Sequence, residues 1–493
     1  MDFLNMLFNK TSSIVDQIKY QALITPEALA IKSKHWGLTY VHLITAIESL
    51  KLNLYKNGAA KGMTVSVALD SARFNTFLLS LALLDLGCVY VANSATKENA
   101  VVPDLMITDA ISQNPLKQIL FDPSWFEEAP SIHEIPNDRH SFSTALFGTS
   151  GSVGTPKVIA LSEEQLLMRV QSHCFGLGHT VINRAWGTLL GPSSLFGYLS
   201  YLSPLIRGGT LVLNSGSTVD ENSNLEAIEH LTLSPQILAL FLDDENLNMN
   251  TFKNLKSIMV SGSAISQTLL DKAFTKLRVE IYSSYGSTEV GPVANLQHIP
   301  KTDKHDAVGY VYPWVELEIV QDNAPLKIGQ EGLIRIRSAY MSDHYHEDQK
   351  STNRSYKDGW FYPGDLGRLT GDGLLHVTGR VSEVINIGGL KISPHKIEEF
   401  VRTLPQIRDV AAFSNTSESG LDQVALAVVT SGPIDFTELH QKCVERFGSV
   451  AAPVRVFHVT NIPRTETGKI QRARLKALLT QDTESASIGN QRD

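Results

Sequence analysis

The chain has 493 residues, of which 43% are hydrophobic and 19% are charged, and its formal net charge is −8. This length and apolar content predict a globular chain of two or three domains and exclude a largely disordered one. No stripe of basic residues is present, which argues against nucleic-acid binding.

The cysteines and the N-terminus bear on where the protein works. Cys88, Cys174 and Cys443 are far apart and form no CxxC pair, which argues against a disulfide framework or a cysteine zinc site and indicates a reducing compartment. Residues 1–17 have no basic region ahead of an apolar core, so they predict the start of a helix and not a signal peptide. No run of about 18 apolar residues occurs, so we expect no membrane span. A cytoplasmic protein is expected.

The first part of the chain alternates strand-like and helix-like runs. Residues 65–69 predict a strand, residues 74–86 a helix that stops at Gly87, and residues 88–92 the next strand. Such a βαβ pattern predicts a mainly parallel sheet covered by helices. Further buried strands are predicted at 210–213 and 257–260.

The pattern changes from about Gly309 onward. Residues 315–320 and 332–337 alternate apolar with polar side chains, and turn residues lie between such runs. This alternation predicts antiparallel β structure.

A third pattern follows Arg380 and predicts a small α+β domain. Its predicted helices are residues 395–404 and 436–447, and its predicted strands are residues 421–430 and 454–457. We therefore expect an N-terminal domain over 1–380 with a β-rich portion at about 309–380, a C-terminal domain over 381–480, and a polar tail over 481–493.

The strongest local motif is the segment 146–162, LFGTSGSVGTPKVIALS. Three glycines, four hydroxyl residues and a lysine fall between Gly148 and Lys157, and such a loop can turn N–H groups, hydroxyls and a cation toward phosphate oxygens. It does not fit the P-loop of NTPases, because its glycine spacing differs from G-x-x-x-x-G-K-[ST] and because a strand, not a helix, follows Lys157. Ser162 with Gln165 predicts a capping box at the start of the next helix. Taken alone, the loop is also compatible with an ordinary glycine-rich turn.

Two further motifs end strands. The segment 282–291, YSSYGSTEVG, offers a tyrosine face for a purine, a threonine for a phosphate and a glutamate for Mg²⁺. The segment 359–368, GWFYPGDLGR, places Asp365 where a carboxylate can accept ribose hydroxyls. Taken alone, the first is also compatible with a strand-end turn, and the second with an Asx turn.

Two motifs belong to the last part of the chain. The segment 379–394 contains the pair Gly388-Gly389, which permits close approach to a ligand. The segment 463–472, PRTETGKIQR, is a basic loop that contains Lys469. Taken alone, Lys469 is also compatible with a solvated surface lysine.

These five segments, in this order, resemble the core motifs of the adenylate-forming superfamily, which includes acyl- and aryl-CoA synthetases, adenylation domains of nonribosomal peptide synthetases, and luciferases. The resemblance implies an α/β fold: a large N-terminal domain of helix-sandwiched β-sheets with a small antiparallel β portion, followed by a small, mobile α+β domain. It also implies a reaction in which a carboxylate attacks the α-phosphorus of ATP and pyrophosphate leaves.

The resemblance implies a role for each motif residue. The ATP phosphate-binding loop would include Thr149, Ser150, Gly151, Ser152, Gly154 and Lys157, and the adenine site would include Ser263, Ala264, Ile265, Tyr285 and Gly286. Thr288 would contact the α-phosphate, Glu289 would hold Mg²⁺, Asp365 would bind the ribose, Arg380 would contact the nucleotide, and Lys469 would reach both the carboxylate and the α-phosphate.

A second half-reaction is also implied, in which a pantetheine thiol takes the acyl group after the small domain rotates. Gly388 and Gly389 would then line the thiol channel, and Ser382 would be the hinge. Relatives usually carry Asp or Lys at that hinge position, so the uncharged Ser382 departs from the usual hinge electrostatics, although a hinge needs permissive backbone angles more than a given side chain.

The class of acid is predicted from the lack of acidic residues in the segment 191–204. Amino-acid-activating relatives place an aspartate there for the substrate ammonium, but Leu195 takes that position here and the segment has no acidic residue. A buried ammonium would remain unpaired, so we expect an aryl or fatty acid without an α-amino group. Leu195, Phe196 and Tyr198 would line the acid pocket, or would simply belong to the core.

Four functions are compatible with these motifs. An acyl- or aryl-CoA ligase that uses ATP, Mg²⁺ and CoA comes first, and a stand-alone ligase that loads an acyl carrier protein through its phosphopantetheine comes second. A luciferase-like oxygenase and a non-enzymatic nucleotide sensor are the remaining alternatives. Lys469 argues against the sensor, because the chemistry needs this lysine more than binding does.

Overall fold

The computed structural model describes the chain between residues 13 and 479, with several gaps. The described residues are 13–69, 73–97, 100–111, 116–126, 144–149, 157–176, 185–213, 225–244, 252–300, 307–387, 390–416, 422–464 and 469–479. Within these residues, no helix is both long and apolar enough to cross a bilayer.

A six-stranded sheet carries the first glycine-rich motif. Its strands pair in parallel except for β7 and β8, which form an antiparallel hairpin. Helix α4 (Arg73–Leu86) joins β3 to β4, which confirms the predicted βαβ unit. The strands lie in the order β6 (Gln118–Leu120), β5 (Leu105–Thr108), β3 (Thr64–Ala68), β4 (Val89–Val91), β7 (Thr144–Gly148) and β8 (Val158–Ser162).

A second sheet begins with parallel strands. The strands β10, β9, β11, β12 and β13 pair in parallel, and β1 pairs in parallel with β10 at one edge. In the order of the sheet, the strands are the edge strand β2 (Gly37–Thr39), which pairs antiparallel with β1, and then β1 (Leu29–Lys32), β10 (Thr210–Val212), β9 (Ala185–Thr188), β11 (His230–Leu233), β12 (Ser257–Ser261) and β13 (Glu280–Ser287).

The same sheet continues as antiparallel structure. Antiparallel pairing begins at β14 (Gly291–His298), earlier than the sequence pattern suggested, because a short turn at 288–290 folds β14 directly back on β13. The remaining strands are β15 (Ala307–Val311), β16 (Val315–Gln321), β17 (Ala324–Pro325), β18 (Gly332–Ser338), β19 (Tyr356–Lys357), β20 (Trp360–Phe361), β21 (Asp365–Leu369) and β22 (Leu374–Arg380).

Helices cover both faces of the parallel strands. Met259 of β12 packs in the large core that includes α6 (Glu163–Gly176) and α7 (Leu195–Ile206), whereas Ile258 packs in a second core with α8 and α9. This alternation is what a strand buried on both faces requires. The other helices are α2 (Ile14–Ile24), α3 (Tyr40–Lys56), α5 (Asn93–Thr96), α8 (Pro235–Asp243), α9 (Gln267–Leu277) and α10 (Gln349–Ser355), with short 3₁₀ turns at Pro123–Phe126 and Leu225–Ala227.

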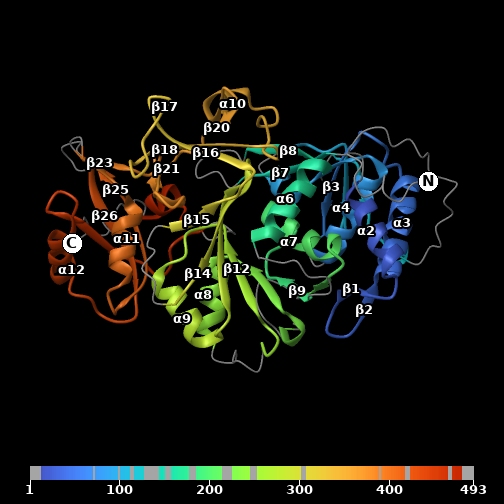
Figure 1. Ribbon diagram of the computed structural model, residues 1–493, viewed down its shortest axis with the longest axis horizontal. Helices are drawn as coiled ribbons and strands as arrows, with labels where there is room; N and C mark the ends of the chain where they lie inside the picture. Colours follow the sequence, from blue (N-terminus) through green and yellow to red (C-terminus); the bar gives the residue numbers. More distant parts are fainter. Residues whose placement is uncertain are drawn as a thin grey trace, which may run out of the picture.

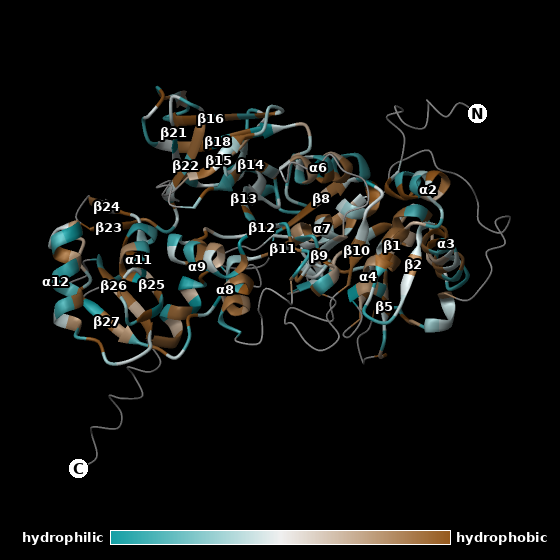
Figure 2. Cartoon of the chain, turned by 60° about the horizontal axis from the view of Figure 1, so that its bottom comes forward, coloured by the Kyte–Doolittle hydropathy of each residue, from teal (hydrophilic) through white to brown (hydrophobic). Residues whose placement is uncertain are grey.

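The last part of the chain forms separate hydrophobic clusters, which contain only residues from 385 onward. It lies at the opposite end of the molecule from α2 and α3 (Figure 1), and its outer helix α12 is mostly hydrophilic in colour, whereas α7 is brown (Figure 2). Its elements are β23 (Ile385–Ile387), β24 (Leu390–Ile392), α11 (Pro394–Arg402), β25 (Ile407–Thr416), β26 (Asp422–Thr430), α12 (Phe436–Phe447) and β27 (Arg455–His458).

Candidate active site

The glycine-rich motif lies at the end of the β7–β8 hairpin, as predicted. The Thr149 N–H donates to the Lys157 carbonyl over 2.7 Å, which closes the base of the loop. The predicted capping box is also present, because Ser162 and Gln165 exchange backbone-to-side-chain hydrogen bonds of 3.0 and 3.2 Å. The predicted phosphate ligands Ser150, Gly151, Ser152 and Gly154 lie outside the described residues.

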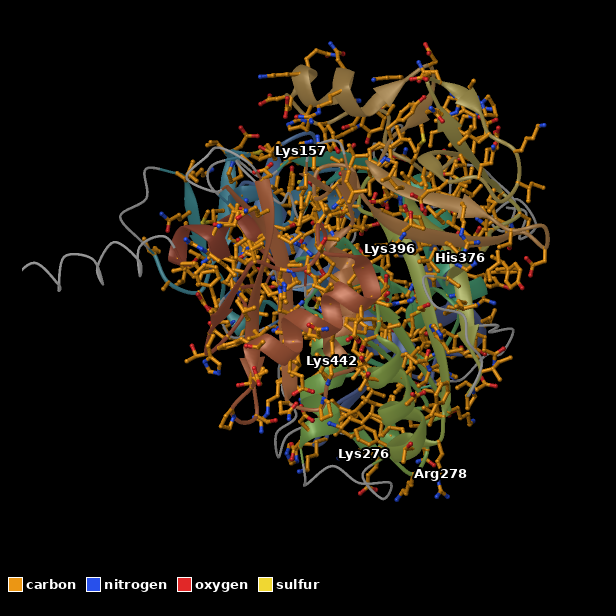
Figure 3. All side chains as sticks on the ribbon, turned by 90° about the vertical axis from the view of Figure 1, so that its left-hand side faces the viewer. Lys157, Lys276, Arg278, His376, Lys396 and Lys442 are labelled. Carbon is orange, nitrogen blue, oxygen red and sulfur yellow. The ribbon has the colours of Figure 1, made fainter. Side chains whose placement is uncertain are left out.

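Lys157 is connected through Tyr345 to Glu289 of the second motif. Its Nζ lies 4.6 Å from the centre of the Tyr345 ring, and it is found next to the segment that carries α10 (Figure 3). The Tyr345 hydroxyl in turn donates to Glu289 Oε1 over 2.7 Å. A chain of contacts thus joins the base of the phosphate loop to the carboxylate expected to hold Mg²⁺.

The second motif forms the end of β13 and the turn that follows it. Thr288 and Glu289 lie in that turn, and both are half-buried. At Gly286, an added Cβ would lie 2.2 Å from the Gly291 carbonyl oxygen of the neighbouring strand. Only glycine therefore lets the two strands approach this closely.

Asp365 lies between two partners from different motifs. It is the direct cross-strand partner of Arg380, whose Nε lies 3.0 Å from Asp365 Oδ1. The Tyr285 hydroxyl donates to Asp365 Oδ2 over 2.7 Å. Burial raises the pKa of Asp365, and the charge of Arg380 and the hydrogen bond from Tyr285 oppose that rise.

Lys469 brings the last motif to this cluster. It is half-buried, between the bridged residues Arg464 and Ile470. Burial and the nearby charge of Arg380 lower its pKa, whereas Glu289 and Asp365 act in the opposite direction. The structure thus brings the fifth motif to residues of the second, third and fourth.

The remaining nucleotide residues flank these groups. Ser263, Ala264 and Ile265 lie between β12 and α9, next to Ser261, whose hydroxyl donates to the Ser284 carbonyl over 2.7 Å. Ser382 lies in a turn directly after β22. The predicted thiol-channel residues Gly388 and Gly389 lie outside the described residues.

The predicted acid-pocket residues on α7 differ from one another in their surroundings. Tyr198 is fully buried against the rings of Phe77 and Phe147, and its hydroxyl lies 3.1 Å from Ser80 Oγ. Leu195 is also buried, whereas Phe196 is half-buried, with its ring centre 5.6 Å from that of His173. Of the three, Phe196 alone is partly exposed.

The donor set fits Mg²⁺ held together with phosphate oxygens. Among the described residues, no three His, Cys, Asp or Glu side chains gather into a metal cluster. Mg²⁺ usually takes only one or two protein carboxylates when a nucleotide supplies the other ligands. Glu289, fixed by Tyr345, is a carboxylate of this kind.

Two residues that contribute to the site, Tyr345 and Arg169, lie outside the five sequence motifs. Both contact the turn that contains Glu289. The Tyr345 hydroxyl bonds the Glu289 carboxylate, and the Arg169 guanidinium bonds the backbone carbonyls of Thr288 and Glu289. Arg169 left one signal in the sequence, because it is a charged residue between Leu166 and Val170 on the buried face of α6. Tyr345 left none, because its segment has no motif.

Comparison with known proteins places these motifs in a family. The model of the AMP-binding enzymes matches residues 92–346, more than half of the chain, and that of the AMP-binding enzyme C-terminal domain matches residues 396–469. The chain is 25% identical over 478 residues to a 2-succinylbenzoate–CoA ligase of Listeria monocytogenes, covering 92% of this chain and 97% of that one. It is also 25% identical over 526 residues to the medium/long-chain-fatty-acid–[acyl-carrier-protein] ligase FadD10 of Mycobacterium tuberculosis, covering 96% of each.

A solved structure agrees in fold. O-succinylbenzoate coenzyme A synthetase (MenE) from Bacillus subtilis, in complex with ATP and magnesium ion, matches with a TM-score of 0.82 and 22% identity, covering 93% of this chain and 99% of that one. The expected α/β fold with a small C-terminal domain is confirmed. The chain belongs to the AMP-binding enzymes, the adenylate-forming family that its motifs resemble.

Proposed function

We propose that this chain is an AMP-forming acid–thiol ligase that activates an aryl carboxylic acid with ATP and transfers the acyl group to CoA. The observation that carries the proposal is the position of Lys469. Its charge interacts with those of Asp365 and Arg380, although the three residues come from motifs spread over more than 100 positions of the chain.

The first half-reaction joins two anions. A carboxylate oxygen of the acid attacks the α-phosphorus of ATP, the bond to the β-phosphate breaks, and pyrophosphate leaves. Negative charge spreads over the phosphoryl oxygens in the transition state, so fixed cations there lower the barrier. Lys469 would supply such a cation between the carboxylate and the α-phosphate.

Residues of the N-terminal motifs would hold the nucleotide. Lys157 and Thr149 would contact the β- and γ-phosphates, Asp365 would accept hydrogen bonds from the ribose, and Thr288 would bond the α-phosphate. Glu289 would hold Mg²⁺, which when bound neutralises phosphate charge. Tyr285, whose hydroxyl already bonds Asp365, would pack against the adenine while it orients that carboxylate.

The second half-reaction moves the acyl group to a thiol. The sulfur attacks the acyl carbon, the bond to the phosphate of AMP breaks, and the thiol proton is lost. Gly388 and Gly389 would line the thiol channel after rotation about Ser382. CoA is the proposed acceptor, because the relative from Listeria monocytogenes is named as a CoA ligase and aligns over nearly the whole chain.

The proposed acid is an aryl acid without an α-amino group, of the class of 2-succinylbenzoate. The name of the Listeria relative supports this class. The absence of acidic residues from 191–204 also supports it, because a substrate ammonium would find no carboxylate there. Phe196 would offer an aromatic edge to the ring of such an acid.

The test measures ATP-dependent pyrophosphate release over 2-succinylbenzoate, benzoic, cinnamic, fatty and α-amino acids, with and without CoA. Release with aryl acids, coupled to formation of the CoA thioester, is expected. If pyrophosphate release does not depend on CoA and the acyl group is transferred to a phosphopantetheinylated carrier protein, the acceptor is the carrier protein and not CoA. A clear preference for an α-amino acid would refute the proposed acid class.

Domain boundaries and location form part of the proposal. We place the boundary at 380/381, with a 1–380 domain whose β-rich portion is about 309–380, a 381–480 lid and a 481–493 tail. Separate hydrophobic clusters beyond residue 385 support this division, and limited proteolysis near Ser382 would test it. Three buried free cysteines favour a reducing cytoplasm, which fractionation of the native host would test.

A further inference from the structure

Arg169 is a fully buried cation beside the proposed catalytic turn. It lies on α6, and its solvent exposure is 0%. Its Nη1 donates to the Thr288 carbonyl over 2.7 Å, its Nη2 to the Glu289 carbonyl over 2.9 Å, and its Nε to the Tyr340 carbonyl over 2.9 Å. One guanidinium thus bonds three backbone carbonyls from two segments of the chain.

Its partners are unusual for a buried arginine. Burial of a charge is costly unless it is paired or fully hydrogen-bonded. Among the described residues, Arg169 forms no ion pair, and its hydrogen bonds go to three backbone carbonyls, while the charge of Glu289 favours its charged form at longer range. Burial lowers the pKa of Arg169 to about 10, which leaves it charged at neutral pH.

Two of the three bonds fix peptide planes of the turn, because their acceptors are the carbonyls of Thr288 and Glu289. The C=O and N–H of a trans peptide point in opposite directions. Because the carbonyls of Thr288 and Glu289 point to Arg169, the N–H groups of Glu289 and Val290 point away from it. The orientation of the turn at 288–290 therefore depends on a side chain from α6.

Arg169 also connects this turn to the segment that holds the Glu289 side chain. The Tyr340 carbonyl belongs to that segment, the Ser342 N–H donates to the Glu289 carbonyl over 2.8 Å, and the Tyr345 hydroxyl bonds the Glu289 carboxylate. Displacement of the turn would thus move both the backbone and the carboxylate of Glu289 relative to Tyr345.

We propose that Arg169 is a positioning residue for adenylation, which holds Thr288 and Glu289 in the orientation that binds MgATP. The inference rests on the proposed function of those two residues. The unpaired positive charge of the guanidinium adds to the potential that attracts the phosphates. The planar fork of arginine is needed because it aims donors at three separate carbonyls, whereas a lysine ammonium is a single point charge.

The experiment compares Arg169→Met, Arg169→Lys and the control Val170→Ala. Val170 is the next residue on α6 and is 1% exposed, so its truncation disturbs the packing of the same helix but removes none of the three bonds to Thr288, Glu289 and Tyr340. Two activities are measured: ATP-dependent pyrophosphate release as a function of MgATP concentration, and CoA thioester formation from a supplied acyl-adenylate. Binding of MgATP is followed separately by thermal shift.

Arg169→Met is expected to weaken the apparent affinity for MgATP by about 10- to 100-fold, the usual effect of removing a residue that orients a metal ligand. Thioester formation from supplied acyl-adenylate should stay within about twofold of wild type, and Val170→Ala should leave both activities within about twofold. Arg169→Lys should fall between wild type and Arg169→Met, because it keeps the charge and loses the fork.

Three results would overturn the inference. They are an unchanged MgATP affinity in folded Arg169→Met, an equal loss in both half-reactions, and a Val170→Ala profile that matches Arg169→Met. If Arg169→Met does not fold, Arg169→Lys carries the same comparison. If wild type makes no acyl-adenylate but MgATP still raises its melting temperature, the proposed function fails, and the thermal shift of the variants still tests Arg169.

Discussion

Asp365 and Arg380 face each other across β21 and β22, with Arg380 Nε 3.0 Å from Asp365 Oδ1. The pair lies at the end of the β-rich region, directly before the turn that contains Ser382. The carboxylate expected to bind the ribose is therefore held by the last residue before the proposed boundary. The proposed ribose ligand and the proposed start of the C-terminal domain therefore meet at this pair.

Asp365→Asn is expected to raise KM for ATP by about tenfold or more, because a neutral amide is a weaker acceptor for two ribose hydroxyls than a carboxylate. Burial raises the pKa of Asp365. As pH falls, the carboxylate is therefore protonated at a higher pH than an ordinary aspartate, and ATP affinity should fall there. KM for ATP measured from pH 5 to 8 checks this, and an acidic loss that persists in Asp365→Asn would assign it to another group.

Lys469→Met is expected to slow adenylation by roughly 10²- to 10³-fold, the usual effect of removing one preorganised charge-stabilising group. Thioester formation from supplied acyl-adenylate should change little. Burial and Arg380 lower the pKa of Lys469, so the wild-type adenylation rate should fall on the alkaline side at a lower pH than for an ordinary lysine. Rapid-quench measurement of acyl-adenylate between pH 7 and 10 tests this. Lys469→Arg should move the alkaline loss upward, and an unmoved loss would exclude Lys469 as its cause.

The sequence predicted elements where the pattern was local. The helix at 436–447 is found as predicted, and 210–213 and 257–260 are strands within one residue. The start of antiparallel pairing was misplaced because polar residues in β13 and β14 hide the hairpin around Glu289. Strand β25 was also missed, although it is ten residues long, because polar residues on both sides leave a continuous apolar run only at 410–413.

The site shows the same division between local and distant information. Sequence motifs predicted Asp365, Glu289 and Lys469 as site residues, because each lies in a short segment of recognisable composition. Tyr345 and Arg169 reach Glu289 from 56 and 120 positions away along the chain. No local pattern records such contacts, since they depend on how α6 and the 340–345 segment pack against β13 and β14.

Tyr345→Phe is expected to raise the Mg²⁺ concentration needed for half-maximal adenylation by up to about tenfold. The change removes the hydroxyl that bonds Glu289 but keeps the ring that faces Lys157. Loss of such an orienting bond typically weakens metal binding. Mg²⁺ titration of pyrophosphate release at fixed ATP measures the effect.

Tyr312→Phe is the matched control, because Tyr312 is buried, as Tyr345 is, but its hydroxyl makes no hydrogen bond to Glu289. Its Mg²⁺ requirement should equal that of wild type. A shift of equal size in both variants would show that the Glu289 bond is not the cause.

Gly286→Ala is expected to lower the free energy of unfolding by about 1–3 kcal/mol, the usual cost of forcing atoms into a packed region. An added Cβ would lie 2.2 Å from the Gly291 carbonyl oxygen, so β13 and β14 must separate. MgATP affinity should fall as well, because the same hairpin carries Thr288 and Glu289.

Gly371→Ala is the control, since its Cβ would meet no atom within 4 Å, and surface changes of that kind stay within about 0.5 kcal/mol. Urea unfolding measures the free energy of unfolding of both variants and of wild type. Equal stabilities would mean that the hairpin can move to admit a methyl group, and the close approach of the two strands would then not be what requires glycine at position 286.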